Sequence, residues 1–183
     1  MISKLLGVVL LICLFPLFIV VALVIILDDG FPIIFRQKRI GKNNIQFLIY
    51  KFRTMKKGTP DIATHLVDDS QSLYTLIGPL LRKFSFDELP QLINIIKGDM
   101  KFIGPRPSLY NQEDLNELRT RAGLDILFPG VTGWAQVNGR DDLSIEEKVK
   151  MDTYYMNNQS FLLNIKILYL TILRVFKAEN VDI

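Results

Sequence analysis

The segment RKFSFDELPQLINIIKGDMKFIGPRP, residues 82–107, decides the fold around two adjacent carboxylates, Asp87 and Glu88. A proline and an apolar run with helical spacing follow them, so a helix begins within this segment. If Ser85 is the N-cap and Glu88 closes a capping box, Pro90 removes one intrahelical hydrogen bond. If Asp87 is the N-cap, Pro90 takes the third helical position, where a backbone N–H would have no intrahelical acceptor, so its absence costs no hydrogen bond. We therefore favour Asp87 as the cap.

A cap at Asp87 places its carboxylate at the positive end of a helix dipole, where it stays ionised and where phosphate oxygens also bind. The alternative is that Asp87 only caps the helix and Glu88 is an ordinary first-turn acid. The end of the segment favours a binding site, because Gly98 ends the helix and a proline on each side restricts the backbone of Arg106. A guanidinium held in this way suits bidentate phosphate recognition, the alternative being a structural salt bridge.

The N-terminal run from Leu5 to Leu27 contains 23 residues without a polar or charged side chain. As a helix it would reach the roughly 30 Å of a bilayer core. Pro16 divides the run: it either kinks a helix that still spans, or lets the chain turn back as a re-entrant hairpin with arms of about 17 Å. Composition alone favours spanning. Several basic residues follow the run and one lysine precedes it, so the globular part is expected in the cytoplasm.

The residues after this run predict a β-hairpin of roughly Pro32 to Gln37 and Ile45 to Phe52, because β-branched and aromatic residues flank the sequence GKNN. Its many basic side chains form a solvated face or contact anionic lipid headgroups. In the alternative, one or two of them hold phosphates, and Lys51 is the best placed at the strand end. A polar, turn-rich stretch over 56–72 predicts a surface loop, and a short helix is expected over about 73–83.

Composition limits the classes of protein that remain. The 183 residues are 49% hydrophobic, which suits one domain with an appendage, and a net charge of +3 does not indicate a general polyanion binder. The only cysteine is Cys13 and the only histidine is His65, so one chain can form neither a disulfide nor a Cys/His metal cluster.

The C-terminal third contains a glycine-rich loop and two helices. FPGVTGWAQVNGRDD surrounds a short apolar strand with glycines and includes Arg140, and such a loop allows a ligand to approach the backbone closely. Ser144 and Glu147 form a capping box that begins an amphipathic helix. The helix over about 160–177 is apolar nearly all round, so it packs in the core or lies at the membrane interface.

Five motifs follow one another along the chain: FRQKRIG, YKFRTM, DELPQLINIIKGDMKFIGPRP, PGVTGWAQVNGR and SFLLNIKIL. Through them, from about Phe35 to Thr171, the chain resembles the bacterial sugar transferases of the small monotopic phosphoglycosyl transferase kind, including those of capsule assembly. The resemblance implies an α+β, mostly helical fold. It has a re-entrant membrane helix over 1–28 that breaks at Pro16, a small β-hairpin, amphipathic interface helices and a compact cytoplasmic catalytic domain over 29–183.

The resemblance also implies the reaction. A sugar-1-phosphate would move from a UDP-sugar to undecaprenyl phosphate or another polyprenol phosphate in the bacterial cytoplasmic membrane, with release of UMP. Asp87 would be the nucleophile that forms a covalent phosphosugar intermediate and would bind the required Mg²⁺. Glu88 would be the second catalytic residue, accepting a proton or hydrogen bond from the acceptor. The implied substrate-binding residues are Lys51, Arg82, Arg106, Gln136 and Arg140.

The expected partners are a UDP-sugar donor, a polyprenol phosphate acceptor, membrane phospholipid and downstream glycosyltransferases, with no nucleic acid. Two rivals remain. A non-catalytic membrane module would use the basic hairpin to hold anionic lipid or a partner protein. An aspartyl-phosphate phosphatase would need a D-x-D nucleophile loop, which the sequence lacks.

Overall fold

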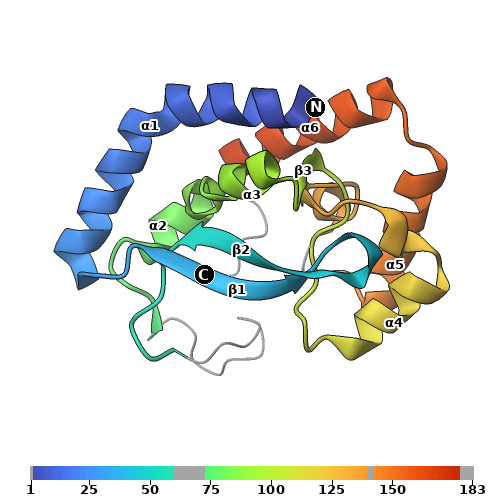
Figure 1. Cartoon of the computed structure of the whole chain (residues 1–183), viewed down its shortest axis with the longest axis horizontal. Helices are drawn as coiled ribbons and strands as arrows, with labels where there is room; N and C mark the ends of the chain where they lie inside the picture. Colours follow the sequence, from blue (N-terminus) through green and yellow to red (C-terminus); the bar gives the residue numbers. More distant parts are fainter. Residues whose placement is uncertain (1, 60–72, 140–141, 178–183) are drawn as a thin grey trace. The chain divides into compact units, whose positions relative to one another are not determined.

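The computed structural model describes residues 2–59, 73–139 and 142–177 (Figure 1). These residues are mostly helical and carry two small sheets, which confirms the α+β class. They fall into two compact units. Residues 2–37, 49–59 and 73–96 form unit 1, and residues 38–48, 97–139 and 142–177 form unit 2. The predicted surface loop over 56–72 lies almost entirely outside the described residues.

Unit 1 begins with helix α1, Ile2–Asp29, which is long and apolar enough to cross a membrane and is only 11% buried over its most apolar window. The helix continues through Pro16 and changes direction partway along its length (Figure 1). A proline inside a helix removes one backbone hydrogen bond, which accounts for a bend. The re-entrant path through a bilayer stays a prediction, as does the division of the chain after residue 28.

Helix α1 is attached to the rest of unit 1 at both ends. Near its start, a Cβ built at Gly7 would lie 3.2 Å from Ile96 Cγ1, so the absence of a side chain permits the close approach. Near its end, Val21 and Ile25 pack in a core cluster with Phe52 and Leu81. Asp28 then accepts backbone hydrogen bonds from residues 76 and 77. The apolar run is therefore part of the folded unit.

The predicted hairpin is confirmed, with shifted bounds. Strand β1 is Ile34–Ile40 and strand β2 is Gln46–Phe52, and a short 3-10 turn, Lys42–Asn44, joins them. Asn43 and Asn44 have positive φ angles of 55° and 58°. Asparagine tolerates this region better than most residues, which explains why a turn without glycine at its centre is stable here.

The segment over 73–97 differs from the prediction at its two helix starts. Helix α2 is only Gly78–Lys83, because the backbone of residues 73 and 75 pairs with residues 56 and 54. Asp87 is not an N-cap: it lies within a single 3-10 turn, Phe86–Glu88, preceded by Ser85 with a φ of 56°. Helix α3, Gln91–Lys97, begins only after Pro90. Proline has no N–H to continue a hydrogen-bonded ladder, so the chain enters α3 through tighter three-residue turns.

Unit 2 is built on two short parallel strands, β3 (Lys101–Ile103) and β4 (Gly130–Thr132), with Lys101 opposite Gly130. Helix α3 ends just before Gly98, as predicted, and this glycine has a φ of 98°. The remaining helical elements are α4 (Glu113–Arg121), η5 (Leu124–Ile126), η6 (Gln136–Asn138), α5 (Ile145–Asn157) and α6 (Phe161–Lys177).

Helices α5 and α6 confirm two predictions. Ser144 and Glu147 form the capping box at the start of α5. Helix α6 packs in the core through Ile167, which is fully buried in a cluster with Val137 and Tyr155. Its other face exposes large apolar side chains: Phe161, Leu162, Ile165, Leu168, Tyr169 and Ile172. One helix therefore has a face in the core, as predicted, and an exposed apolar face, while its place at a membrane interface stays a prediction.

Candidate active site

A lysine and two carboxylates meet in unit 1. Lys51 Nζ lies 2.8 Å from Glu88 Oε1 and 3.8 Å from Asp87 Oδ2. The three side chains are between 9% and 16% exposed, so their charges are largely removed from water. The ammonium of Lys51 is close enough to both carboxylates to offset part of the repulsion between them. The structure thus brings together three of the residues that the sequence singled out.

Two elements place this group. Lys51 is the next-to-last residue of β2, and the carboxylates lie on the 3-10 turn before α3. A 3-10 turn has three residues per turn, so the side chains of Asp87 and Glu88 diverge by about 120°. A cation can contact both only at the end of a long side chain, such as that of Lys51. The strand is held to α3 by Asn94, which is fully buried and accepts a hydrogen bond of 3.1 Å from the backbone N–H of Tyr50.

Arg82 also belongs to unit 1, and the structure surrounds it with polar and aromatic groups. It donates hydrogen bonds to Tyr74 Oη at 2.6 Å and to Thr54 Oγ1 at 3.2 Å. Its guanidinium lies 4.8 Å from the centre of the Tyr74 ring, a cation–π distance. These contacts fix the side chain, and a contact with substrate phosphates stays a prediction.

The other predicted binding residues belong to unit 2 or lie outside the described residues. Arg106 lines a small pocket together with Pro107, Ser108 and Arg119. Gln136 is buried, and neither its amide nitrogen nor its amide oxygen has a hydrogen-bond partner within the described part of the chain. A buried amide is costly to leave unpaired, so Gln136 suits a polar contact that these residues do not supply. Arg140 lies outside the described residues.

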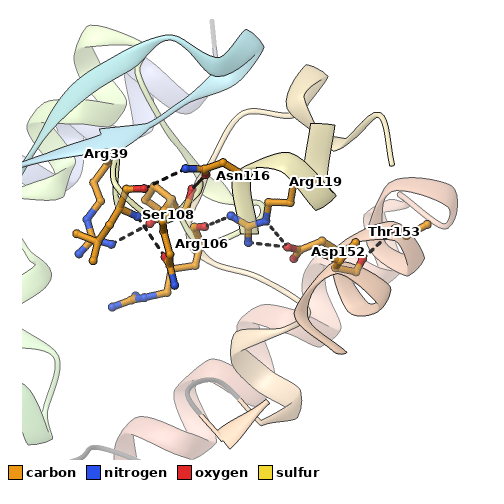
Figure 2. A network of polar contacts seen from close by, with 11 residues as sticks. Arg39, Arg106, Ser108, Asn116, Arg119, Asp152 and Thr153 are labelled. Carbon is orange, nitrogen blue, oxygen red and sulfur yellow. Dashed lines mark hydrogen bonds and ion pairs between the residues drawn. The ribbon is translucent and has the colours of Figure 1, made fainter. Parts of the chain in front are cut away.

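A polar network in unit 2 surrounds the backbone of Arg106 (Figure 2). Arg119 donates to Asp152 Oδ2 from two nitrogens, at 3.1 and 2.6 Å, and to the carbonyl oxygen of Arg106 at 2.8 Å. Asp152 is 1% exposed. Burial raises the pKa of its carboxyl above the ordinary value, and the charge and hydrogen bond of Arg119 oppose this shift.

Comparison with known proteins identifies the family. The sequence profile described as "Bacterial sugar transferase" matches residues 1–178. The chain belongs to the bacterial sugar transferase family. The expected family is thereby confirmed, and the motifs at 87–88 and 105–107 are parts of a bacterial sugar transferase rather than isolated patterns.

Three curated relatives illustrate the family. The "Uncharacterized sugar transferase EpsL" of Bacillus subtilis strain 168 is 43% identical over 87% of this chain and 77% of its own length. The "Undecaprenyl-phosphate glucose phosphotransferase" of Komagataeibacter xylinus is 39% identical over 95% of this chain. A "UDP-N-acetylgalactosamine-undecaprenyl-phosphate N-acetylgalactosaminephosphotransferase" of Aeromonas hydrophila is 38% identical over 86% of it. The chain spans only 35% and 38% of the last two relatives, so the match covers one part of each.

The carboxylates of this bacterial sugar transferase fit a magnesium ion. No group of three or more His, Cys, Asp or Glu side chains in the described residues could hold a metal by itself. Magnesium is usually bound through one or two carboxylates together with substrate phosphates and water, so a full protein cage is not needed. Adjacent carboxylates at Asp87 and Glu88, both largely buried, supply such a donor set.

Two residues of the site region were missed by the sequence analysis. Asn94 lies seven residues after Asp87, and no local pattern shows that it contacts the backbone of residue 50. For Asp152 the sequence does contain a signal, because it lies three residues before Tyr155 and therefore on the same face of the predicted amphipathic helix. In the structure both residues are buried on that face of α5. A buried acid needs a partner, which here is Arg119.

Proposed function

We propose that this protein is a polyprenyl-phosphate sugar phosphotransferase of the bacterial membrane. It transfers a sugar-1-phosphate from a UDP-sugar to undecaprenyl phosphate, releases UMP and starts the assembly of a capsular polysaccharide or exopolysaccharide. Membership of the family supports this reaction, as do the names of the relatives from Komagataeibacter xylinus and Aeromonas hydrophila. The apolar helix α1 supports association with a membrane.

The observation that carries the proposal is the buried group of Lys51, Asp87 and Glu88. In the first step an oxygen of the Asp87 carboxylate attacks the phosphorus that bears the sugar. The bond from this phosphorus to the UMP oxygen breaks, and UMP leaves with the electron pair. In the second step a phosphate oxygen of undecaprenyl phosphate attacks the same phosphorus, and the Asp87 carboxylate is released.

A carboxylate suits this exchange better than a hydroxyl. An acyl phosphate has a transfer potential comparable with that of the pyrophosphate bond broken and the one formed, so little driving force is lost between the two steps. Glu88, which holds Lys51 in a direct hydrogen bond, would accept a proton or hydrogen bond from the incoming phosphate. Lys51 would remain between the carboxylates and help to offset the charge of the donor.

The charge of the donor pyrophosphate needs further cations. Magnesium, bound through Asp87, would neutralise phosphate charge in this reaction. Arg82 and Arg106 are proposed to bind donor phosphates, and Gln136 and Arg140 to bind other parts of the substrates. Arginine suits this role because its planar fork matches two phosphate oxygens.

We place the catalytic residues on the cytoplasmic side of the membrane, where UDP-sugars are made. The basic side chains after α1 support this orientation by the positive-inside rule. Helix α1 would enter the bilayer as a re-entrant helix, and Pro16 inside it would be the point where it bends. The exposed apolar face of α6 is an amphipathic surface suited to the interface between phospholipid and water. A lipid-linked sugar is then available to downstream glycosyltransferases.

The test is an assay of UMP release from the full chain with Mg²⁺ and, in turn, UDP-glucose, UDP-galactose, UDP-N-acetylglucosamine and UDP-N-acetylgalactosamine. Without acceptor, the active donor should give UMP stoichiometric with protein and a phosphosugar adduct on Asp87, detected by intact-protein mass spectrometry. With undecaprenyl phosphate, UMP should accumulate over many turnovers. A folded protein that releases no UMP from any donor would favour the non-catalytic module, and release of inorganic phosphate would favour a phosphatase.

A further inference from the structure

We propose that Arg119 and Asp152 are a positioning pair that holds the backbone of Arg106 so that its guanidinium can bind the donor. This inference rests on the proposed function, in which Arg106 binds donor phosphates. It assigns to two residues of α4 and α5 a part in substrate binding that they perform through the backbone of a third residue.

The first argument is the hydrogen bonding of the segment around Arg106. Its two prolines have no N–H, so the segment cannot hold itself with a regular backbone ladder. Instead, each carbonyl from residue 105 to 109 accepts a hydrogen bond from a donor elsewhere in unit 2. In chain order, these donors are Gly130 N, Arg119 Nη1, Arg39 Nη1, Ile40 N and Asn116 Nδ2. The backbone is therefore fixed from outside at five successive residues.

Within this series, Arg119 acts directly on Arg106. Its Nη1 donates to the Arg106 carbonyl at 2.8 Å, while Nε and Nη2 donate to Asp152 Oδ2 (Figure 2). A guanidinium is planar and rigid, so fixing two of its nitrogens on the carboxylate sets the direction of the third. A shift of Asp152 or Arg119 would thus move the carbonyl of Arg106 rather than only loosen a surface contact.

The second argument is the burial of this ion pair. Asp152 is 1% exposed and the Arg119 side chain is 13% exposed. Removing two charges from water costs about as much as their attraction returns, and apolar residues of similar volume often stabilise a fold equally well. Stability alone therefore gives little reason for an ion pair at this position. Holding the carbonyl of Arg106, which two apolar side chains cannot do, is a reason.

The third argument is the pocket. Arg106 and Arg119 both line it, together with Ser108 and Asn116, whose side chains are hydrogen-bonded to each other. The residue that holds the Arg106 backbone thus lines the same pocket as Arg106 itself. A change at Arg119 or Asp152 would therefore move a residue that lines the pocket.

The experiment replaces the pair without leaving a buried charge. In the double variant Arg119→Met, Asp152→Leu, both charges are lost together, so no buried charge is left unpaired and the variant should stay folded at the assay temperature. The melting temperature should fall only by the effect of the Arg106 carbonyl, which loses its donor. The KM for the UDP-sugar that gives the fastest UMP release should rise between about tenfold and a hundredfold, with a smaller change in kcat. Arg119→Lys keeps the charge but cannot bond both groups in the same geometry, so it should show the same rise in KM.

The matched control is Arg121→Gln, on the same helix. Arg121 pairs with Glu117 at the surface, with side chains 70% and 64% exposed, so this change should leave KM unaltered. Hydrogen–deuterium exchange supplies a readout that does not need turnover. The amides of Gly130 and Ile40, which donate to the carbonyls of residues 105 and 108, should exchange faster in the double variant, and at the wild-type rate in Arg121→Gln.

A cycle with Arg106→Ala tests whether the pair acts through Arg106. If it does, adding the double variant to Arg106→Ala should raise KM no further. A fully additive rise, or a folded double variant with wild-type KM and wild-type exchange, would overturn the inference. Absence of UMP release from the wild-type protein with all four donors would instead overturn the proposed function, and the exchange measurement would then still decide whether the pair holds this backbone.

Discussion

Lys51 and Glu88, 37 residues apart in the sequence, are joined by a hydrogen bond of 2.8 Å between the ammonium and a carboxylate oxygen. The same ammonium lies 3.8 Å from Asp87 Oδ2. Strand β2 is thereby tied to the turn before α3 at the group on which the proposed chemistry depends. The ammonium of Lys51 helps two neighbouring carboxylates to be largely buried together.

Replacing Lys51 by Met should affect both stability and activity. Two largely buried carboxylates would lose the ammonium that lies 2.8 and 3.8 Å from them, which should lower the free energy of unfolding by about 1.5–3 kcal/mol. UMP release should fall by about a hundredfold or more, because the donor phosphates would approach the two carboxylates without the ammonium of Lys51. Thermal melts and UMP assays measure the two effects. Lys51→Arg keeps the charge and should recover most of the stability; a Met variant with normal UMP release would show that Lys51 has no part in the reaction.

Substitutions at the two carboxylates should affect different steps of the reaction. Asp87→Asn cannot form the acyl phosphate, so the phosphosugar adduct and the UMP released without acceptor should both disappear. Glu88→Gln should still form the adduct, while turnover with undecaprenyl phosphate should fall between about 10² and 10⁴-fold. Mass spectrometry and single-turnover UMP assays distinguish the steps. Normal lipid-linked product from Asp87→Asn would refute the covalent route.

Much of the local structure could be predicted because it depends on local rules. The capping box at Ser144 and the helix end at Gly98 follow from residue types at fixed offsets, and both are confirmed. The N-cap at Asp87 also rested on a local rule, and it was wrong. Pro90 excludes a regular helix start nearby, and the chain uses a 3-10 turn after a left-handed Ser85, which no preference of the individual residues indicates.

The contacts that hold the site could not be predicted, because they join residues far apart in the sequence. Asn94 meets the backbone of Tyr50 across 44 positions, and Arg119 meets Asp152 across 33. A periodic pattern shows which face of a helix is buried, but it does not show which partner a buried polar side chain will find there. The family motifs indicated Arg106 as a functional residue, whereas the residues that hold its backbone became visible only in the structure.

Asn94 should support the position of Lys51 from a distance. Asn94→Ala leaves the backbone N–H of Tyr50 without its acceptor, which should cost about 1–3 kcal/mol of stability. Because residue 50 is next to Lys51, UMP release should fall even at temperatures where the variant is fully folded. Asn157→Ala, at an exposed position at the end of α5, is the matched control and should change neither property. Equal loss of activity in both variants would argue against a specific role for Asn94.

The pH dependence of stability should reveal the raised pKa of the Asp152 carboxyl. Burial raises the pKa of its carboxyl above the ordinary 3.8, and Arg119, the charged group that it contacts, opposes this shift. Because the folded pKa exceeds the unfolded one, the folded protein binds more protons between the two values. The contribution of Asp152 to the free energy of unfolding is therefore fully present below 3.8 and falls as the pH rises through the raised pKa.

Asp152→Asn has no group to titrate at this position, so it provides the reference. The stability of the wild type minus that of Asp152→Asn should decrease as the pH rises from below 3.8 toward neutrality. Chemical denaturation of both proteins at a series of pH values, in the same detergent, measures this difference. All other groups are common to the two proteins, so their titration largely cancels. A difference that increases with pH would mean that Arg119 stabilises the charged carboxylate by more than burial destabilises it.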